Sequence, residues 1–179
     1  MKIHGLISYP AYIDEISVYL GKLRDLYNAD LNEKQVRFKR GDRSEFVNIL
    51  GIRGELIFQH FLHQQGVPFS SCAMLDNRPV SSYDLRIDNG KTYCLDIKTI
   101  RTDAPDLLVN AEAHQKAAAK SITHYVFIQI TEPQQARYWI YTVDQVGSWD
   151  KKKVGYSEAH YLPLKEAYSM NTATEPEGV

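Results

Sequence analysis

The chain has few cysteines, no long apolar run and almost no net charge, and each of these absences excludes a class of protein. Two cysteines among 179 residues are too few for a disulfide framework, so we expect Cys72 and Cys94 to be buried free thiols. No apolar run approaches the roughly 18 residues that a membrane-spanning helix needs. The N-terminal segment lacks the apolar stretch and the cleavage site of a signal peptide. We therefore expect a cytoplasmic protein.

The formal net charge of −1 excludes a strongly basic nucleic-acid-binding protein. A local basic surface on a neutral body is still compatible with an enzyme that acts on nucleic acid. One basic segment contains Arg40 and Arg43, and another is the run from Lys151 to Lys153. Because a charged segment is usually a solvated face, phosphate contact and plain surface both stay open for each segment.

Hydrophobic periodicity predicts helices in the first part of the chain. Apolar residues recur at three- and four-residue steps between positions 11 and 28, which indicates an amphipathic helix. Asp42 and Glu45 resemble a capping box, so a second helix should begin near them. Gly51 and Gly54 interrupt the apolar face of this helix, so one helix and two consecutive helices both fit the pattern.

The pattern changes to strands after residue 68. The expected elements are strands at 69–75, 82–87 and 92–98, a helix at 110–121, strands at 125–130 and 137–143, and an irregular region at 144–170 with a short helix near 164–168. A central mixed β-sheet flanked by helices is the simplest way to bury these elements. The sequence therefore predicts one domain of the α/β (α+β) class.

The tripeptide Asp96-Ile97-Lys98 is the part of the sequence that points most directly to chemistry. Because alternate residues of a strand share a face, Asp96 and Lys98 should project together, while Ile97 enters the layer behind them. Taken alone, the same pair would also suit an edge strand whose solvated face carries a neutralising ion pair. A second acidic residue on the same face would favour a functional site.

The position of Asp84 relative to this strand depends on the length of the hairpin loop. With a two-residue Asn89-Gly90 loop, Asp84 would lie opposite residue 95 and would face the other side of the sheet from Asp96. With a three-residue loop from Asp88 to Gly90, Asp84 would pair one position earlier, and the two aspartates would be diagonal neighbours about 7–8 Å apart. A metal site requires the second geometry.

Two carboxylates that converge on one face repel each other unless a cation or a proton lies between them. Oxygen ligands suit Mg²⁺, which can polarise a phosphodiester and lower the pKa of a bound water. Lys98 would orient that water or stabilise negative charge that develops on phosphorus. Glu55, on the second predicted helix, is a candidate third carboxylate, and its other reading is a helix-surface glutamate.

Together, Asp84, the tripeptide Asp96-Ile97-Lys98 and the upstream Gly54-Glu55 resemble the motif of the PD-(D/E)XK nuclease superfamily. Tyr83 stands where the family name has proline, a residue that does no chemistry. Asp96 stands where glutamate is commoner, which the superfamily allows.

The resemblance extends to the order of elements over about residues 43–143. It implies that this segment is a restriction-endonuclease-like catalytic core. Residues 1–42 would then be a helical N-terminal extension, and residues 144–179 a C-terminal extension with a flexible tail.

The resemblance also implies roles for individual residues. Asp84, Asp96 and Glu55 would bind Mg²⁺, which Mn²⁺ can replace, and the Ile97 carbonyl would be a further ligand, with Lys98 as the catalytic lysine. Some families of the superfamily also have a glutamine on the helix after the motif, and here Gln115 fits, with Lys116 and Lys120 as phosphate contacts. An ordinary exposed helix face explains these three residues equally well.

The function expected from these residues is metal-dependent hydrolysis of phosphodiester bonds in DNA, with RNA as substrate and a homodimeric state both left open. One alternative is a non-catalytic nucleic-acid-binding or interaction module that retains the nuclease fold. Another is an unrelated α/β protein in which Asp96 and Lys98 form a surface pair. The convergence of the carboxylates distinguishes the last alternative from the other two.

Overall fold

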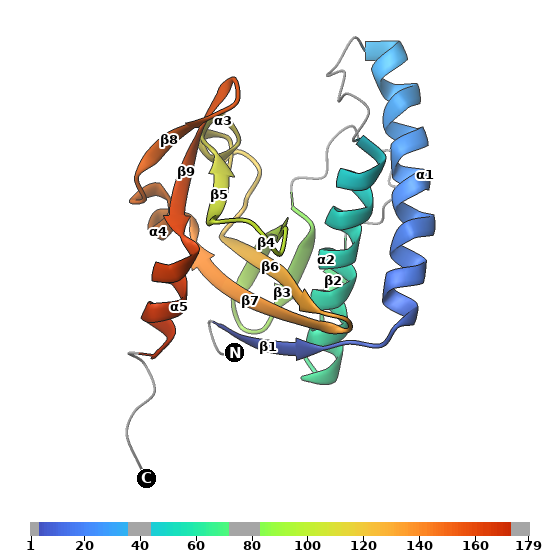
Figure 1. Ribbon diagram of the computed structural model, residues 1–179, viewed down its shortest axis with the longest axis horizontal. Helices are drawn as coiled ribbons and strands as arrows, with labels where there is room; N and C mark the ends of the chain where they lie inside the picture. The colour runs from blue at the N-terminus through green and yellow to red at the C-terminus, as the bar shows by residue number, and fades with distance from the viewer. Residues whose placement is uncertain (1–3, 36–43, 72–82, 173–179) are drawn as a thin grey trace.

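The computed structural model describes residues 4–35, 44–71 and 83–172 (Figure 1). The elements, in chain order, are β1 (His4–Ser8), α1 (Tyr12–Gln35), α2 (Ser44–Gln64), β2 (Ser70–Ser71), β3 (Leu85–Asp88), β4 (Thr92–Ile100), β5 (Asp106–Asn110), α3 (Ala111–Gln115), β6 (His124–Glu132), β7 (Gln135–Thr142), α4 (Val143–Gly147), β8 (Lys151–Val154), β9 (Ser157–Pro163) and α5 (Leu164–Thr172). None of the helices in these ranges combines the length and apolar composition that crossing a bilayer demands.

Within the described residues, six strands form the main sheet in the order β1-β7-β6-β4-β3-β2. β4 and β6 run parallel, and the other neighbouring pairs are antiparallel. The predicted class, a mixed central sheet with flanking helices, is therefore confirmed. Helices α1 and α2 lie side by side on one face of this sheet (Figure 1).

The opposite face of the main sheet is covered by a second, antiparallel sheet in the order β5-β9-β8, together with α4 and α5 (Figure 1). Strand β6 contributes to both cores because its residues alternate in direction. Val126 and Ile128 pack in the core that contains Phe58 of α2. Tyr125 and Phe127 pack in the core on the side of the second sheet. Burial on both faces explains the near-continuous apolar run of this strand.

Helix α2 is continuous through both of its glycines, so the two-helix alternative is wrong. Gly54 lies against β4, where a Cβ atom would stand 1.9 Å from the Thr99 hydroxyl oxygen. Glycine is therefore required for the close approach of this helix to β4. The same approach brings the next residue, Glu55, to the strand that carries the Asp96-Ile97-Lys98 tripeptide.

Several predicted elements differ in extent from the structure. The helix expected at 110–121 is the short α3, Ala111–Gln115, followed by turns. The short helix expected near 164–168 is present as α5, but the rest of the region expected to be irregular, 144–163, contains most of α4 together with β8 and β9. The strand expected at 69–75 is present at Ser70–Ser71, Phe69 precedes it outside the strand, and residues 72–75 lie outside the described ranges. Cys94 is buried as a free thiol, as predicted, whereas Cys72 lies outside the described residues.

Candidate active site

The β3–β4 hairpin has neither of the two predicted registers. Its pairs run from Leu85 opposite Leu95 to Asp88 opposite Thr92, so the loop is 89–91. Gly90 has the expected positive φ, +71°. Asp88 belongs to the strand because its carboxylate accepts a hydrogen bond from the Thr92 hydroxyl at 2.6 Å, across the base of the loop. The prediction that the loop contains Asp88 is therefore wrong.

The paired part of the hairpin ends with Leu85 opposite Leu95, so Asp84 lies next to the part of β4 that carries Asp96 and interacts with it electrostatically. Two hydrogen bonds hold Asp84 against β4. Its backbone N–H donates to the Leu95 carbonyl at 2.8 Å, and its Oδ2 accepts from the Ile97 N–H at 2.6 Å. The carboxylate is therefore held against the backbone of the tripeptide.

The same hydrogen bonds show where the Ile97 carbonyl points. In a strand, the N–H and C=O of one residue turn toward the same neighbouring strand. The Ile97 N–H reaches Asp84, so the Ile97 carbonyl also turns away from β6 and toward the β3 side. β3 begins at Leu85, so this carbonyl lies beyond the paired part of β3. It is a backbone oxygen beside the Asp84 carboxylate that the β4–β6 ladder does not use.

Burial raises the pKa of Asp84 to about 7, and the neighbouring negative charges of Glu55 and then Asp96 contribute to the rise. The Ile97 N–H and the Lys98 ammonium oppose it. Three carboxylates from α2, β4 and the start of the hairpin are thus within electrostatic reach of one another. This is the arrangement in which a bound cation or proton is needed.

Lys98 lies next to Asp96, with 2.5 Å between its Nζ and the Asp96 Oδ1. The ion pair expected for a solvated edge strand is therefore present. However, β4 is not an edge strand, because it lies between β6 and β3 in the main sheet. Lys98 also acts on Asp84, whose pKa it lowers. The pair is part of a partly buried charge cluster.

Glu55 faces this cluster and is held by Arg24 of α1. The Arg24 Nη1 and Nη2 donate to Glu55 Oε1 and Oε2 at 2.8 and 2.9 Å, a bidentate pair that is largely shielded from solvent. Arg24 also interacts electrostatically with Asp84. The interpretation of Glu55 as a surface glutamate is therefore wrong.

Arg24 was not among the residues selected from the sequence. A signal was present, because Ser17 and Gly21 on the same face of α1 are small and buried. A face of small residues marks a helix that packs closely against its neighbour. An arginine on that face needs a partner of opposite charge.

The residues predicted to contact nucleic acid after the motif lie at the end of α3 and in the turns that follow it. Gln115 is exposed at the end of the helix, and Lys116 pairs with Glu112 on the surface at 2.5 Å. Lys120 is half-buried in the turns that follow. Arg40 and Arg43 lie outside the described residues.

A different residue of α3 turns inward. His114 Nδ1 lies 3.2 Å from the Tyr125 hydroxyl, and its ring centroid is 4.6 Å from that of His160 on β9. Burial lowers the pKa of His114, and the positive charges of His160 and Lys151 lower it further. Tyr125 in turn interacts electrostatically with Asp96. A polar strip therefore runs from Asp96 toward the second sheet.

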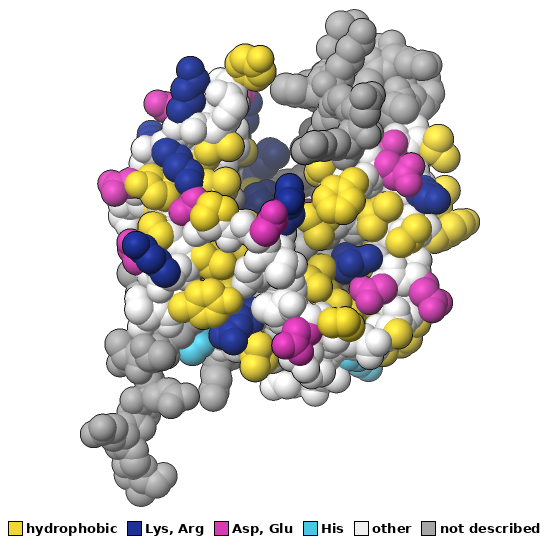
Figure 2. All heavy atoms as spheres, viewed as in Figure 1, with side chains coloured by type: hydrophobic (Ala, Val, Ile, Leu, Met, Phe, Trp, Pro, Cys, Tyr) yellow, Lys and Arg dark blue, Asp and Glu magenta, His cyan; other side chains and the backbone are white. Residues whose placement is uncertain are grey.

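The surface of the molecule is hollowed beside the β8–β9 hairpin, where Lys and Arg side chains line the depression (Figure 2).

Among the described residues, no three histidine, cysteine, aspartate or glutamate side chains already stand in a metal-ligating arrangement. Glu55 is held by Arg24, and Asp96 is paired with Lys98.

No family model matches the chain. No curated protein matches it either. Among solved structures, the chain can be superposed on Hjc, a Holliday junction resolvase from the archaeal hyperthermophile Archaeoglobus fulgidus, with a TM-score of 0.41 and 13% sequence identity. The superposition covers 66% of this chain and 95% of the resolvase chain. With so loose a likeness, function has to be argued from the geometry of the site.

Proposed function

We propose that the protein is a divalent-metal-dependent nuclease that hydrolyses phosphodiester bonds in DNA. The observation that carries this proposal is the juxtaposition of Asp84 and Asp96 across the hairpin, with Glu55 and Lys98 beside them. A buried acidic cluster is costly for a protein that makes no use of it. A neighbouring ammonium group is suited to a reaction in which negative charge develops.

The residues of the site fit a hard divalent cation. All the candidate ligands are oxygen atoms: the carboxylates of Asp84, Asp96 and Glu55 and the carbonyl of Ile97. The pKa of Asp84, raised to about 7, means that this carboxyl holds a proton more tightly than an ordinary aspartate does, and a cation would replace that proton. When bound, Mg²⁺ or Mn²⁺ would polarise the phosphodiester and lower the pKa of a bound water.

The other residues of the site have roles that follow from their positions. Lys98 is held beside Asp96 at 2.5 Å, so its ammonium can donate hydrogen bonds to the attacking water or to a phosphate oxygen. Arg24 holds Glu55 in a fixed orientation through two hydrogen bonds, so it acts as a positioning residue. The hydrogen bond from the Ile97 N–H positions Asp84 in the same way.

A cleavage assay on end-labelled nucleic acid tests the proposal. The substrates are duplex, single-stranded and branched DNA and an RNA of the same sequence, each with Mg²⁺ and with EDTA. We expect cleavage of a DNA substrate only with Mg²⁺, and its loss in Asp96→Ala and in Lys98→Ala. Typical losses when a charge-stabilising group is removed are about 100-fold or more.

The matched controls are Asp103→Ala and Arg101→Ala. Arg101 and Asp103 form another charge pair two residues apart, joined at 2.6 Å just after β4, but both are well exposed. Their removal should leave cleavage unchanged. Full activity in both Asp96→Ala and Lys98→Ala would remove the site from consideration.

The second candidate is a nucleic-acid-binding module without catalysis. It is favoured by the way in which Arg24 and Lys98 neutralise Glu55 and Asp96 within the chain itself. This candidate predicts DNA binding that does not depend on metal, no heat of Mg²⁺ binding in calorimetry, and no cleavage of any substrate. Titration with Mg²⁺ alone therefore separates the two candidates.

A further inference from the structure

Helix α1 exposes a continuous apolar stripe on the side that faces away from the rest of the molecule. Tyr12, Ile16, Tyr19 and Leu26 are 53%, 42%, 65% and 69% exposed. Their spacings of four, three and seven residues place all four on one face of a helix. We call these four residues the α1 stripe. Hydrophobic side chains also gather over the α1–α2 side of the surface in Figure 2.

The inward side of α1 is only partly apolar. Ile13 is buried in the core, but Ser17, Gly21 and Arg24 make polar contacts or close backbone approaches to α2. A surface helix normally turns its apolar residues inward and its polar residues to solvent. The packing of α1 on α2 therefore does not account for the α1 stripe.

The exposed apolar area is large enough to matter for association. From their exposed fractions, the four side chains of the α1 stripe present on the order of 500 Å² of apolar surface, at the upper end of what monomeric proteins expose in one patch. With a polar rim, such a patch approaches the roughly 800 Å² that each partner contributes to a standard interface.

We propose that this face binds a second copy of the same chain, as an antiparallel contact between two α1 helices centred on Tyr19. A two-fold contact requires one surface that is complementary to itself. In the antiparallel arrangement about Tyr19, Tyr12 of one copy lies opposite Leu26 of the other, and the two Tyr19 rings meet at the axis. Tyr12 and Leu26 lie seven residues on either side of Tyr19, so these three members of the stripe have the symmetry that a two-fold contact needs.

The charges beside the stripe fit the same symmetry. Glu15 and Lys22 are exposed on one flank of α1, four residues before and three residues after Tyr19. The antiparallel arrangement brings Glu15 of each copy to within one residue of Lys22 of the other along the axis, which yields two complementary pairs. In a parallel two-fold contact the flanks that carry Glu15 and Lys22 would lie on opposite sides of the interface, so these pairs would not form. Lys22 makes a long contact, 3.9 Å, with Glu45, and both side chains are more than half exposed.

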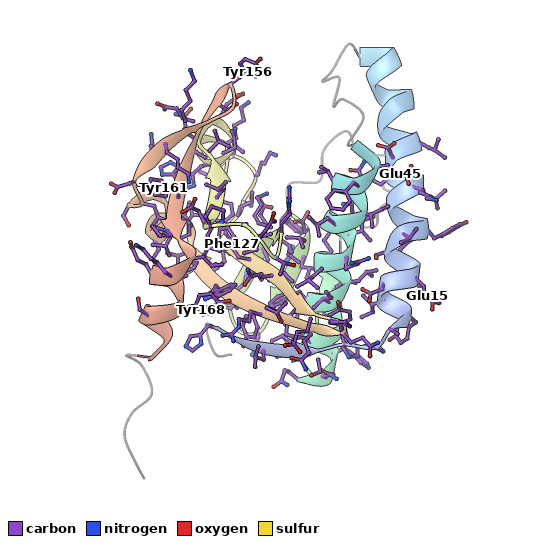
Figure 3. All side chains as sticks on the ribbon, in the orientation of Figure 1. Glu15, Glu45, Phe127, Tyr156, Tyr161 and Tyr168 are labelled. Atoms are coloured by element: carbon purple, nitrogen blue, oxygen red, sulfur yellow. The ribbon has the colours of Figure 1, made fainter. Side chains whose placement is uncertain are left out.

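The experiment is sedimentation equilibrium of the full chain without DNA or metal, so its outcome is independent of the proposed nuclease activity. We expect a reversible dimer. Tyr19→Lys, which places two ammonium groups at the axis, should raise the dimer dissociation constant at least about 100-fold. The matched control is Tyr156→Lys, because Tyr156 is fully exposed at the tip of the β8–β9 hairpin, on the other side of the molecule (Figure 3). It should leave the dimer unchanged.

A charge exchange gives a second test that leaves the apolar stripe intact. Glu15→Lys should weaken the dimer about fivefold through like charges across the axis, and the addition of Lys22→Glu should restore it. A chain that is monomeric at every concentration, or a dimer that Tyr19→Lys leaves intact, would overturn the proposal. So would a monomer that sediments with lipid vesicles, since the stripe would then belong to a membrane surface.

Discussion

Replacement of Asp84 by asparagine should stabilise the metal-free protein, and the gain should increase with pH. Burial, with the charges of Glu55 and Asp96, raises the pKa of Asp84 from an ordinary 3.8 to about 7. Between these two values the folded protein holds a proton that the unfolded chain releases. The contribution of this carboxyl to the free energy of unfolding is therefore fully present below pH 4, and it is lost as the pH rises through 7.

The magnitude follows from the width of that window. Each unit of difference between the folded and unfolded pKa is worth about 1.4 kcal/mol, so the whole window from 3.8 to about 7 corresponds to about 4 kcal/mol. Asparagine does not ionise, and its amide oxygen can still accept the hydrogen bond from the Ile97 N–H. Between pH 5 and pH 8, the stability of Asp84→Asn relative to the natural chain should rise by about 3 kcal/mol.

The assay is urea unfolding in EDTA at pH 5 and pH 8, followed by tryptophan fluorescence. The matched control is Asp88→Asn on the same hairpin, where hydrogen bonds from Thr92 and then Arg86 lower the pKa of the exposed carboxyl. The Asp88 carboxyl changes the free energy of unfolding in the opposite direction. Its stabilising contribution is present above the ordinary pKa of an aspartate and is lost as the pH falls below that value. An Asp84→Asn difference that stays the same at both pH values would refute the reasoning.

The same variant also tests metal binding without any nuclease reaction. At pH 8, Mg²⁺ at 100 times its dissociation constant should stabilise the natural chain by about 2.7 kcal/mol. Asp84→Asn, which has lost one of the proposed ligands, should gain much less at the same concentration. Equal stabilisation of the two proteins would place any bound ion elsewhere.

Three further predictions follow from other contacts. Gly54→Ala should destabilise the protein by about 1–3 kcal/mol in urea unfolding, because its Cβ would lie 1.9 Å from the Thr99 hydroxyl oxygen, whereas Gly51→Ala, whose Cβ would meet only Arg24 Nη1 at 3.9 Å, should stabilise the same helix by up to about 1 kcal/mol. Arg24→Gln should cost about 3 kcal/mol in the same assay by leaving Glu55 without its bidentate partner, and the double variant with Glu55→Gln should recover most of that loss. Lys98→Gln should lower single-turnover cleavage while leaving the calorimetric affinity for Mg²⁺ nearly unchanged, since Lys98 is not a proposed ligand; an equal loss of both would assign it a role in metal binding.

The hairpin could be predicted from the sequence, but its register could not. Asn89-Gly90 indicates a turn between two alternating segments, and the structure has that turn. Whether Asp88 belongs to the loop depends on side-chain hydrogen bonds. Its carboxylate accepts from Thr92 at 2.6 Å and from Arg86 at 2.9 and 3.1 Å, which keeps it in the strand. A strand pattern carries no information about such contacts.

The second sheet was missed for a related reason. The run from Lys151 to Lys153 reads as a solvated charged segment, but it forms β8, at the edge of that sheet. Lysines are common on edge strands because they discourage pairing with another chain. Lys152 is the exception within the run, since it pairs with Asp106 and lies 4.7 Å from the centre of the Tyr161 ring. Only tertiary contacts distinguish it from its two neighbours.

Helix α1 shows why a correct prediction of an element can still miss its function. Periodicity predicts the helix, and the structure contains it, but apolar spacing does not say which face turns inward. Ile16, counted with the apolar face, is 42% exposed, while the buried face carries small residues and Arg24 beside the apolar Ile13. One face of α1 therefore reaches the acidic cluster through Glu55, and the other carries the α1 stripe. If two copies meet through that stripe, the helix that joins them is also the helix that holds a carboxylate of each active site. A variant that separates the copies, such as Tyr19→Lys, would then leave the Arg24–Glu55 pair intact, because that pair lies on the opposite face of the same helix.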